Sequence, residues 1–327
     1  MGSSASVTVS GSTPIPSTFT ASTMPSGSAW YGVTYGLVSA TPTFVAVSGS
    51  STGAYSTNGT TWTTSTMPSA SDWTSVFYGN GYFVAVQDSG TTAGAYSTNG
   101  TTWTASTMPS SLYWYGGAYG LIGATPTFVA VAYGATTVGA SSTNGTSWTA
   151  RTMPSSQNWY DVTYGNGYFV AVAHNTTAAA YSTNGTTWTA STMPSSLSWF
   201  NVAYGLVGST PTYVAMQNSG TTASAYSTNG TTWTASTMPS SSYWFAVAYG
   251  NGYFVAVAQS TTVGAYSANG ITWTAGTMPS SQNWQAITYG NSYFVAVAAS
   301  TTVGAYSAQS VLLPVNFGIY NGPTTIN

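Results

Sequence analysis

The 327-residue sequence is 43% hydrophobic and 15% aromatic but only 1% charged, with one basic residue, three acidic residues and a formal net charge of −2. Phosphate contacts require clustered Lys and Arg, so this composition excludes nucleic-acid binding, and it excludes polybasic attachment to a membrane for the same reason. The apolar runs, such as Tyr168–Ala173, are far shorter than the roughly 20 residues of a membrane span, so membrane insertion is not expected.

Two motifs recur along the whole chain. The tripeptide Thr-Met-Pro begins at Thr23, Thr66, Thr107, Thr152, Thr192, Thr237 and Thr277. A tryptophan follows each copy, at Trp30, Trp73, Trp114, Trp159, Trp199, Trp244 and Trp284. The second motif, Ser-Thr-Asn-Gly-Thr-Thr-Trp or a close variant, ends at Trp62, Trp103, Trp148, Trp188, Trp233 and Trp273. Such self-similarity at 40–45 residues is typical of a ring or solenoid of repeated units.

Each repeat predicts four short strands, as residues 244–276 illustrate. Segments 244–250, 253–258, 263–268 and 271–276 read as strands, and helical periodicity is absent. Asn269-Gly270 predicts a tight hairpin with φ > 0 at both residues. The connection between the first two strands is expected to be a longer loop at 37–42, 121–126 and 206–211, and a tight Gly-Asn turn elsewhere, as at Gly79-Asn80.

These signals predict an all-β fold, a seven-bladed β-propeller of four-stranded antiparallel blades over residues 17–310, with tails at 1–16 and 311–327. The last repeat lacks its Asn-Gly turn and fourth strand, whereas residues 19–25 match the missing piece. The N-terminal strand is therefore expected to complete the last blade and close the ring. The alternative is an open solenoid, which would carry polar caps. The recurring Trp, Met and Tyr residues are expected to pack between neighbouring blades.

The Ser-Thr-Asn-Gly-Thr-Thr-Trp turn resembles the Asp-box of BNR-type propellers, with Asn in place of Asp and a turn that is one residue shorter. The resemblance implies a hairpin between the third and fourth strands of a propeller blade. Members of that group include sialidases and other glycosidases, sugar-binding propeller lectins and virion-attached proteins. The motif itself is structural in that group, so it implies a fold and leaves the function open.

Counting chemical groups argues against an enzyme. A sialidase-like site needs an arginine triad and an acidic pair, but the chain has a single Arg, Arg151, and no Glu. Its acids, Asp72, Asp88 and Asp161, occupy non-equivalent positions in the repeats, so no two of them are compelled to meet. The only imidazole, His174, lies in a loop. We therefore expect no catalytic residue, no cofactor and no metal.

Differences between the repeats concentrate in two segments that emerge on the same face of a propeller. These are the loop after the second strand and the residues just before each first-strand Trp. Aromatic rings stack on pyranose rings while amides and hydroxyls bond their OH groups, so this face suits neutral glycans. The candidate binding residues are Tyr113, Trp114, Asn158, Trp159, Tyr243, Trp244, Asn283, Trp284, Tyr133 and His174. The alternative is that this face varies because it is plain solvent surface.

The sequence thus suggests adhesion or architecture. We expect an extracellular binding module that recognises cell-surface glycans on a virion or tail fibre or as a secreted lectin, and no signal peptide is recognisable. The alternative is a structural decoration or coat protein without sugar binding. The apolar tail 311–327 is expected to dock on other virion or coat subunits, or on the chain's own last blade. A homo-oligomer is left open.

Overall fold

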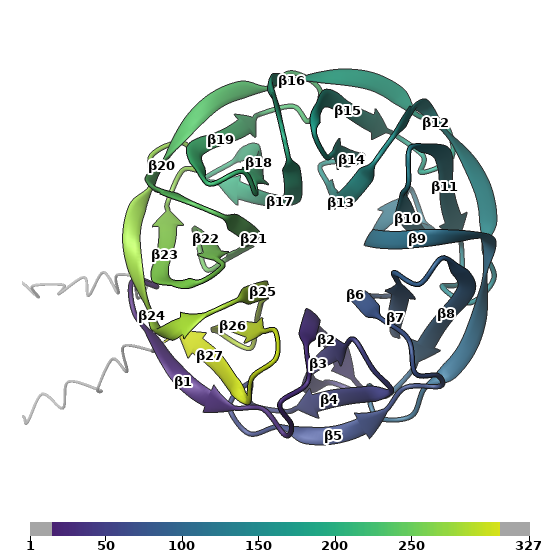
Figure 1. Ribbon diagram of the computed structural model, residues 1–327. Helices are drawn as coiled ribbons and strands as arrows, with labels where there is room; N and C mark the ends of the chain where they lie inside the picture. Colours follow the sequence, from purple (N-terminus) through teal and green to yellow (C-terminus); the bar gives the residue numbers. More distant parts are fainter. Residues whose placement is uncertain (1–14, 308–327) are drawn as a thin grey trace, which may run out of the picture.

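The computed structural model describes residues 15–307, and every regular element within that range is a β-strand (Figure 1). The strands pair antiparallel in repeated four-stranded units, which confirms the all-β prediction. Residues 15–307 contain no helix that is long and apolar enough to cross a membrane. Of the predicted tails, residues 1–14 and all of 311–327 lie outside the described residues, and so does the expected docking of the C-terminal tail.

In each unit the strands follow one another from the central axis to the rim (Figure 1). The strands nearest the axis are β2 (Trp30–Val38), β6 (Trp73–Gly79), β9 (Thr104–Ile122), β13 (Trp159–Gly165), β17 (Trp199–Val207), β21 (Trp244–Gly250) and β25 (Trp284–Gly290). The second strands are β3 (Thr41–Ser48), β7 (Tyr82–Gln87), β10 (Thr125–Tyr133), β14 (Tyr168–Ala173), β18 (Thr210–Gln217), β22 (Tyr253–Ala258) and β26 (Tyr293–Ala298).

The third strands are β4 (Thr52–Ser56), β8 (Thr91–Ser97), β11 (Thr136–Ser142), β15 (Thr176–Ser182), β19 (Thr221–Ser227), β23 (Thr261–Ser267) and β27 (Val303–Ser307). The remaining outer strands are β1 (Phe19–Thr23), β5 (Thr63–Thr66), β12 (Thr149–Gln157), β16 (Thr189–Leu197), β20 (Thr234–Ser242) and β24 (Thr274–Gln282). Strand β1 pairs with β27, so the first strand within residues 15–307 lies in the same sheet as the last three of that range.

The hydrogen-bonded strands form six sheets, five with four strands and one with seven. The seven-stranded sheet arises because β9 is continuous over 19 residues: its first part pairs with β8 and its second part with β10. Elsewhere the chain breaks before the next inner strand, as between Gln157, which ends β12, and Trp159, which begins β13. The number of sheets therefore differs from the seven separate blades expected, because the segment that connects two units within β9 does not interrupt that strand.

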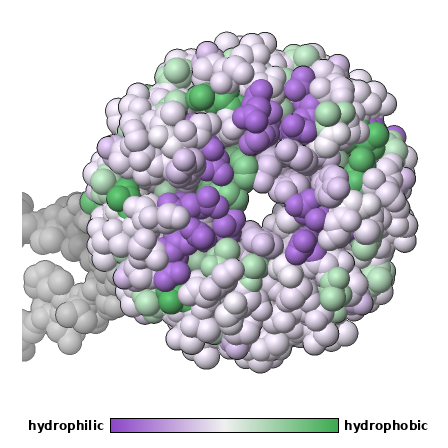
Figure 2. All heavy atoms as spheres, viewed as in Figure 1, coloured by the Kyte–Doolittle hydropathy of each residue, from purple (hydrophilic) through white to green (hydrophobic). Residues whose placement is uncertain are grey.

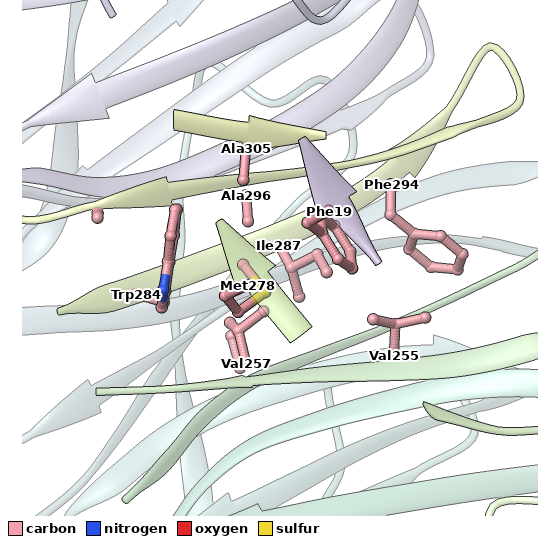
Figure 3. Packing of buried hydrophobic residues seen from close by; sticks show 11 residues of the cluster. Phe19, Val255, Val257, Met278, Trp284, Ile287, Phe294, Ala296 and Ala305 are labelled. Carbon is pink, nitrogen blue, oxygen red and sulfur yellow. The ribbon is translucent and has the colours of Figure 1, made fainter. Parts of the chain in front are cut away.

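The core consists of apolar clusters that each join two neighbouring units. Figure 3 shows one of them, in which Val255 and Val257 of β22 pack against Trp284 and Phe294 of the following unit. Phe19 of β1 completes this cluster. Burial of one such large apolar side chain contributes about 1.5–3 kcal/mol, so the interfaces between units carry much of the stability. The expected packing of Trp and Met between units is confirmed here by Trp284 and Met278.

The hairpin turns between third and fourth strands are built by side chains. In the turn of residues 97–103, the Ser97 hydroxyl accepts a hydrogen bond from Gly100 N at 2.8 Å, and Asn99 Oδ1 accepts from Thr101 N and Thr102 N, each at 2.9 Å. Only the glycine has a positive φ, of 74°. The expected turn with φ > 0 at both residues is therefore wrong, because the asparagine acts through its side chain rather than its backbone.

The connection between first and second strands is a tight turn throughout. At the predicted longer loop 37–42, strands β2 and β3 simply extend to Val38 and Thr41, and the turn consists of Ser39 and Ala40, with φ of 47° and 68°. The equivalent turn in a shorter unit is Asn80-Gly81, with φ of 47° and 81°. The long loops expected in alternate repeats are instead extensions of the first and second strands by further paired residues. The polar and small residues of these segments do not indicate that extension.

Candidate functional site

A β-bulge sets the direction of one residue in every inner strand. In β13, Trp159 pairs with Ala173 and Asp161 with Val172, which leaves Tyr160 between them as the extra residue. The same register shift occurs directly after the tryptophan near the start of the pairing in every other inner strand. Bulges re-aim side chains, and here the residue that follows each Trp is the unpaired one.

These residues surround an axial cavity of about 550 Å³. Every inner strand contributes to its wall, and Figure 2 shows a central opening with strongly hydrophilic surface beside it. The residues next to the Trp that line the cavity are Tyr31, Thr74, Tyr115, Tyr160, Phe200, Phe245 and Gln285. Small-ligand sites are cavities of about 300–1,000 Å³, and the volume of this one lies in that range.

Four of these rings make a continuous wall, which we call the aromatic arc: Tyr115, Tyr160, Phe200 and Phe245. Their ring centroids lie 4.4 Å apart between Tyr115 and Tyr160, 3.6 Å between Tyr160 and Phe200, and 4.3 Å between Phe200 and Phe245. Each ring comes from a different inner strand. The arc therefore exists only when consecutive units pack side by side around the axis.

Two predicted site residues, Tyr133 and His174, pack against the arc. The Tyr133 ring lies 5.5 Å from Tyr115, and the His174 ring lies 5.8 Å from Tyr160 and 6.0 Å from Phe200. Burial lowers the pKa of His174, so the imidazole is neutral near neutral pH. The structure thus brings together two residues that the sequence singled out, Tyr133 at the end of β10 and His174 just after β14, but neither of them lines the cavity.

All three acidic residues of the chain line this one cavity. Asp72 precedes β6, Asp88 follows β7, and Asp161 lies within β13. The expectation that no two of them need meet is wrong, because inner strands and second-to-third loops converge on the same axis. Asp88 N donates to Asp72 O at 2.8 Å, which holds the two segments side by side, and the Tyr115 hydroxyl donates to Asp88 Oδ2.

The third acid takes part in a chain of hydrogen bonds between inner strands. Asp161 Oδ2 accepts from Asn201 Nδ2 at 2.7 Å and from Val202 N at 2.9 Å, and Asn201 Oδ1 in turn accepts from Val247 N at 2.8 Å. These side chains satisfy backbone amides of the next strand around the axis. Burial raises the pKa of Asp161 to about 7, although hydrogen bonds from Val202 and Val162 oppose that shift.

The raised pKa predicts that stability falls as pH rises. Unfolded Asp loses its proton near pH ~4, whereas folded Asp161 keeps it to about pH 7, so the folded state binds more protons in between. The free energy of unfolding is then highest below pH ~4, declines through this window and levels off above it. Denaturant titrations across this range should show the decline, and Asp161→Asn should reduce its slope. A residual slope of the same sign is expected from Asp88, whose pKa burial also raises.

The predicted tryptophans lie in the core. Trp114, Trp159, Trp244 and Trp284 have no exposed surface, so none of them offers a ring face to a sugar. Three of them also donate their indole N–H to a backbone carbonyl four residues earlier, as Trp159 does to Ser155 O at 3.3 Å. The stacking role expected for these residues is therefore corrected to packing between units.

The residues before those tryptophans fasten one unit to the previous one. Asn158 Oδ1 accepts from Gly134 N at 3.1 Å and from Ala135 N at 2.7 Å, and Asn283 Oδ1 accepts from the Ser260 hydroxyl at 2.7 Å. Backbone bonds also join the two variable segments, as predicted for a shared face. Tyr113 and Tyr243 are about half exposed, at 45% and 53%.

None of the ten predicted residues lines the cavity. The residues that do line it follow the first-strand Trp, and reasoning from the sequence overlooked them because strict strand alternation assigns that position to no particular face. A signal was nevertheless present. The residue after each of these tryptophans is aromatic in five of the seven repeats: Tyr31, Tyr115, Tyr160, Phe200 and Phe245.

No family model and no curated protein matches the sequence. Solved structures match it in fold: virginiamycin B lyase from Staphylococcus aureus has a TM-score of 0.76 at 11% identity, covering 89% of this chain and 99% of the lyase. YCF48 bound to D1 peptide has a TM-score of 0.67 at 15% identity, covering 89% and 95%. The computationally designed Ika8 protein has a TM-score of 0.58 at 10% identity, covering 88% and 98%. The fold is a β-propeller with repeated four-stranded blades.

This comparison contradicts the prediction that the chain is not an enzyme, because a structure similar to it in fold is that of a lyase. The separation of the acids, on which that prediction rested, is also absent, because all three line one cavity. At 11% identity the likeness concerns the fold alone and assigns no reaction to this chain.

Proposed function

We propose that the axial cavity binds the sugar units of a glycan, with the aromatic arc as the apolar wall. The observation that carries this proposal is the position of the arc beside neutral hydrogen-bonding groups in one cavity. Thr74, Ser75, Thr163, Gln285 and Thr288 line the remaining wall and offer hydroxyl and amide groups to sugar OH groups. The propeller neighbours captured with ligands, YCF48 with D1 peptide and virginiamycin B lyase with quinupristin, support ligand binding by this architecture.

We further propose that the six sheets make a closed ring of seven blades, with β9 shared by two of them. The pairing of β1 with β27 supports closure. A second support is the packing of the last inner strand on the first: a Cβ at Gly290 would lie 2.0 Å from the Tyr35 ring, as one at Gly79 would lie 2.0 Å from the Tyr119 ring. The joint between the last and first units thus has the same glycine-on-tyrosine contact as an internal joint.

Adhesion is the role that we propose for this site, with the propeller displayed on a virion or a cell surface. The resemblance of the Ser-x-Asn-Gly turn to the Asp-box, whose bearers include propeller lectins and virion-attached proteins, supports it. The low charge of 1% also supports it, because a surface of Ser and Thr hydroxyls stays hydrated without attracting charged partners non-specifically.

The test is binding of neutral oligosaccharides, measured as a rise in melting temperature and by calorimetry. Phe245→Ala removes the ring at one end of the arc and should weaken binding about fivefold, the equivalent of one stacking contact. Tyr243→Ala is the matched control, since this ring lies two residues away, is 53% exposed and does not line the cavity. No stabilisation by any neutral sugar, or equal losses in the two variants, would contradict the proposal.

A further inference from the structure

The distribution of charge in this molecule is uneven. The chain has three carboxylates and all of them line the axial cavity, whereas its single basic residue, Arg151, does not. Arg151 lies on β12, where its Nε donates to the Ser141 hydroxyl at 2.7 Å. A cavity lined by charges of one sign focuses the field and concentrates ligands of the opposite sign. Among the described residues, no basic side chain reaches this cavity to neutralise it.

Two of the acids belong to a compact group, which we call the tyrosine–aspartate cluster: Tyr31, Asp72, Asp88 and Tyr115. The Tyr115 hydroxyl donates to Asp88, and the backbones of Asp72 and Asp88 are bonded to each other. Tyr31 and Asp72 lie side by side, because a Cβ added at Gly49 would lie 2.8 Å from the Tyr31 ring and 2.9 Å from Asp72 Oδ1. Burial, and then the nearby Asp72 and Asp88 carboxylates, raise the pKa of Tyr31.

Aromatic rings and carboxylates side by side are the groups that recognise organic ammonium ions. The ring faces attract a cation by about 0.5–2 kcal/mol, and a carboxylate adds a charge-assisted hydrogen bond. A divalent metal is a poorer match, since Ca²⁺ takes 6–8 oxygen ligands and residues 15–307 hold no group of three metal-binding side chains. The cavity, at about 550 Å³, is also far larger than one ion needs.

We propose that the ligand of this cavity carries a protonated amine, as an unacetylated amino sugar does, and that Asp88 and Asp72 bind the ammonium group beside Tyr31 and Tyr115. This inference rests on the proposed glycan site and names its ligand class. The arc takes the sugar ring while the tyrosine–aspartate cluster takes the cation. A neutral glycan alone would use neither the Asp72 nor the Asp88 carboxylate, whereas Asp161 already accepts hydrogen bonds from Asn201 and Val202.

Three matched trimers test this: β-1,4-linked glucosamine, its N-acetylated counterpart and cellotriose, titrated calorimetrically into the full chain at mildly acidic pH. The glucosamine trimer should bind about tenfold tighter than the other two, and added salt should erase the difference. Asp88→Asn keeps an acceptor for the Tyr115 hydroxyl, and should reduce the affinity for the glucosamine trimer to that for cellotriose without changing the latter.

Asp72→Asn gives a second measurement. Because the Asp72 side chain is exposed, this substitution should leave folding intact, and it should reduce the affinity for the glucosamine trimer less than Asp88→Asn does. Arg151→Ser also changes the net charge by one unit, in the opposite direction and away from the cavity, and should leave all three affinities unchanged. Equal affinities for the three trimers, or no loss in Asp88→Asn, would overturn the ammonium inference while leaving the glycan site in place. Failure of all three trimers to bind would overturn the proposed function and this inference together.

Discussion

Replacing Phe19 with alanine will lower the free energy of unfolding by about 3–5 kcal/mol, the usual loss for a buried Phe. Phe19 is only 5% exposed and packs against Val255, Met278 and Phe294, which come from two different units. Its strand, β1, also pairs along the outer edge of β27. The variant therefore loses core packing at the joint between β1 and β27. Guanidinium denaturation measures the resulting change in the free energy of unfolding.

The matched control is Thr20→Ala, the next residue on the same strand, whose side chain is exposed. It should change the free energy of unfolding by no more than ~0.5 kcal/mol. A loss below ~1 kcal/mol in Phe19→Ala would mean that β1 contributes little to the fold, contrary to a closed ring.

Replacing Trp159 with alanine will cost a similar ~3–5 kcal/mol, because the indole is fully buried between two units. It lies in one cluster with Val129 and Val131 of β10 and with Ala171 of β14. Its N–H also satisfies the Ser155 carbonyl, which the variant leaves without that donor. Thermal and denaturant unfolding measure the loss.

This variant separates packing from ligand binding, the role that the sequence suggested for Trp159. Trp159→Phe keeps a buried ring but loses the N–H and part of the indole volume, so it should destabilise the fold less than Trp159→Ala and leave the affinity for sugars unchanged. Tyr113→Ala provides a surface comparison, since this ring is 45% exposed, and should be nearly neutral for stability. A loss of sugar affinity in a stable Trp159→Phe protein would restore the tryptophan to the site.

The strand content follows from the sequence because its causes are local. Alternating and continuous apolar runs such as Tyr253–Ala258 select extended backbone, and the recurring Asn-Gly and Ser-x-Asn-Gly segments select turns. The match between residues 19–25 and the fourth strand of other repeats likewise predicted the pairing of β1 with β27. The details of turn geometry were less accessible, because a side chain such as Asn99 can replace the backbone conformation that its residue type suggests.

The site depended on tertiary structure. One extra residue in each bulge turns Tyr160, Phe200 and their equivalents toward the axis, and strand alternation alone does not predict which way such a residue points. The convergence of the inner strands and of the loops beside them then brings Asp72, Asp88 and Asp161 to one cavity, although they occupy different positions in their repeats. Local patterns in the sequence are enough to predict repeated antiparallel strands. Where the three acids and the aromatic arc meet follows from the convergence of those strands on an axis, because it depends on distances between residues far apart in the chain.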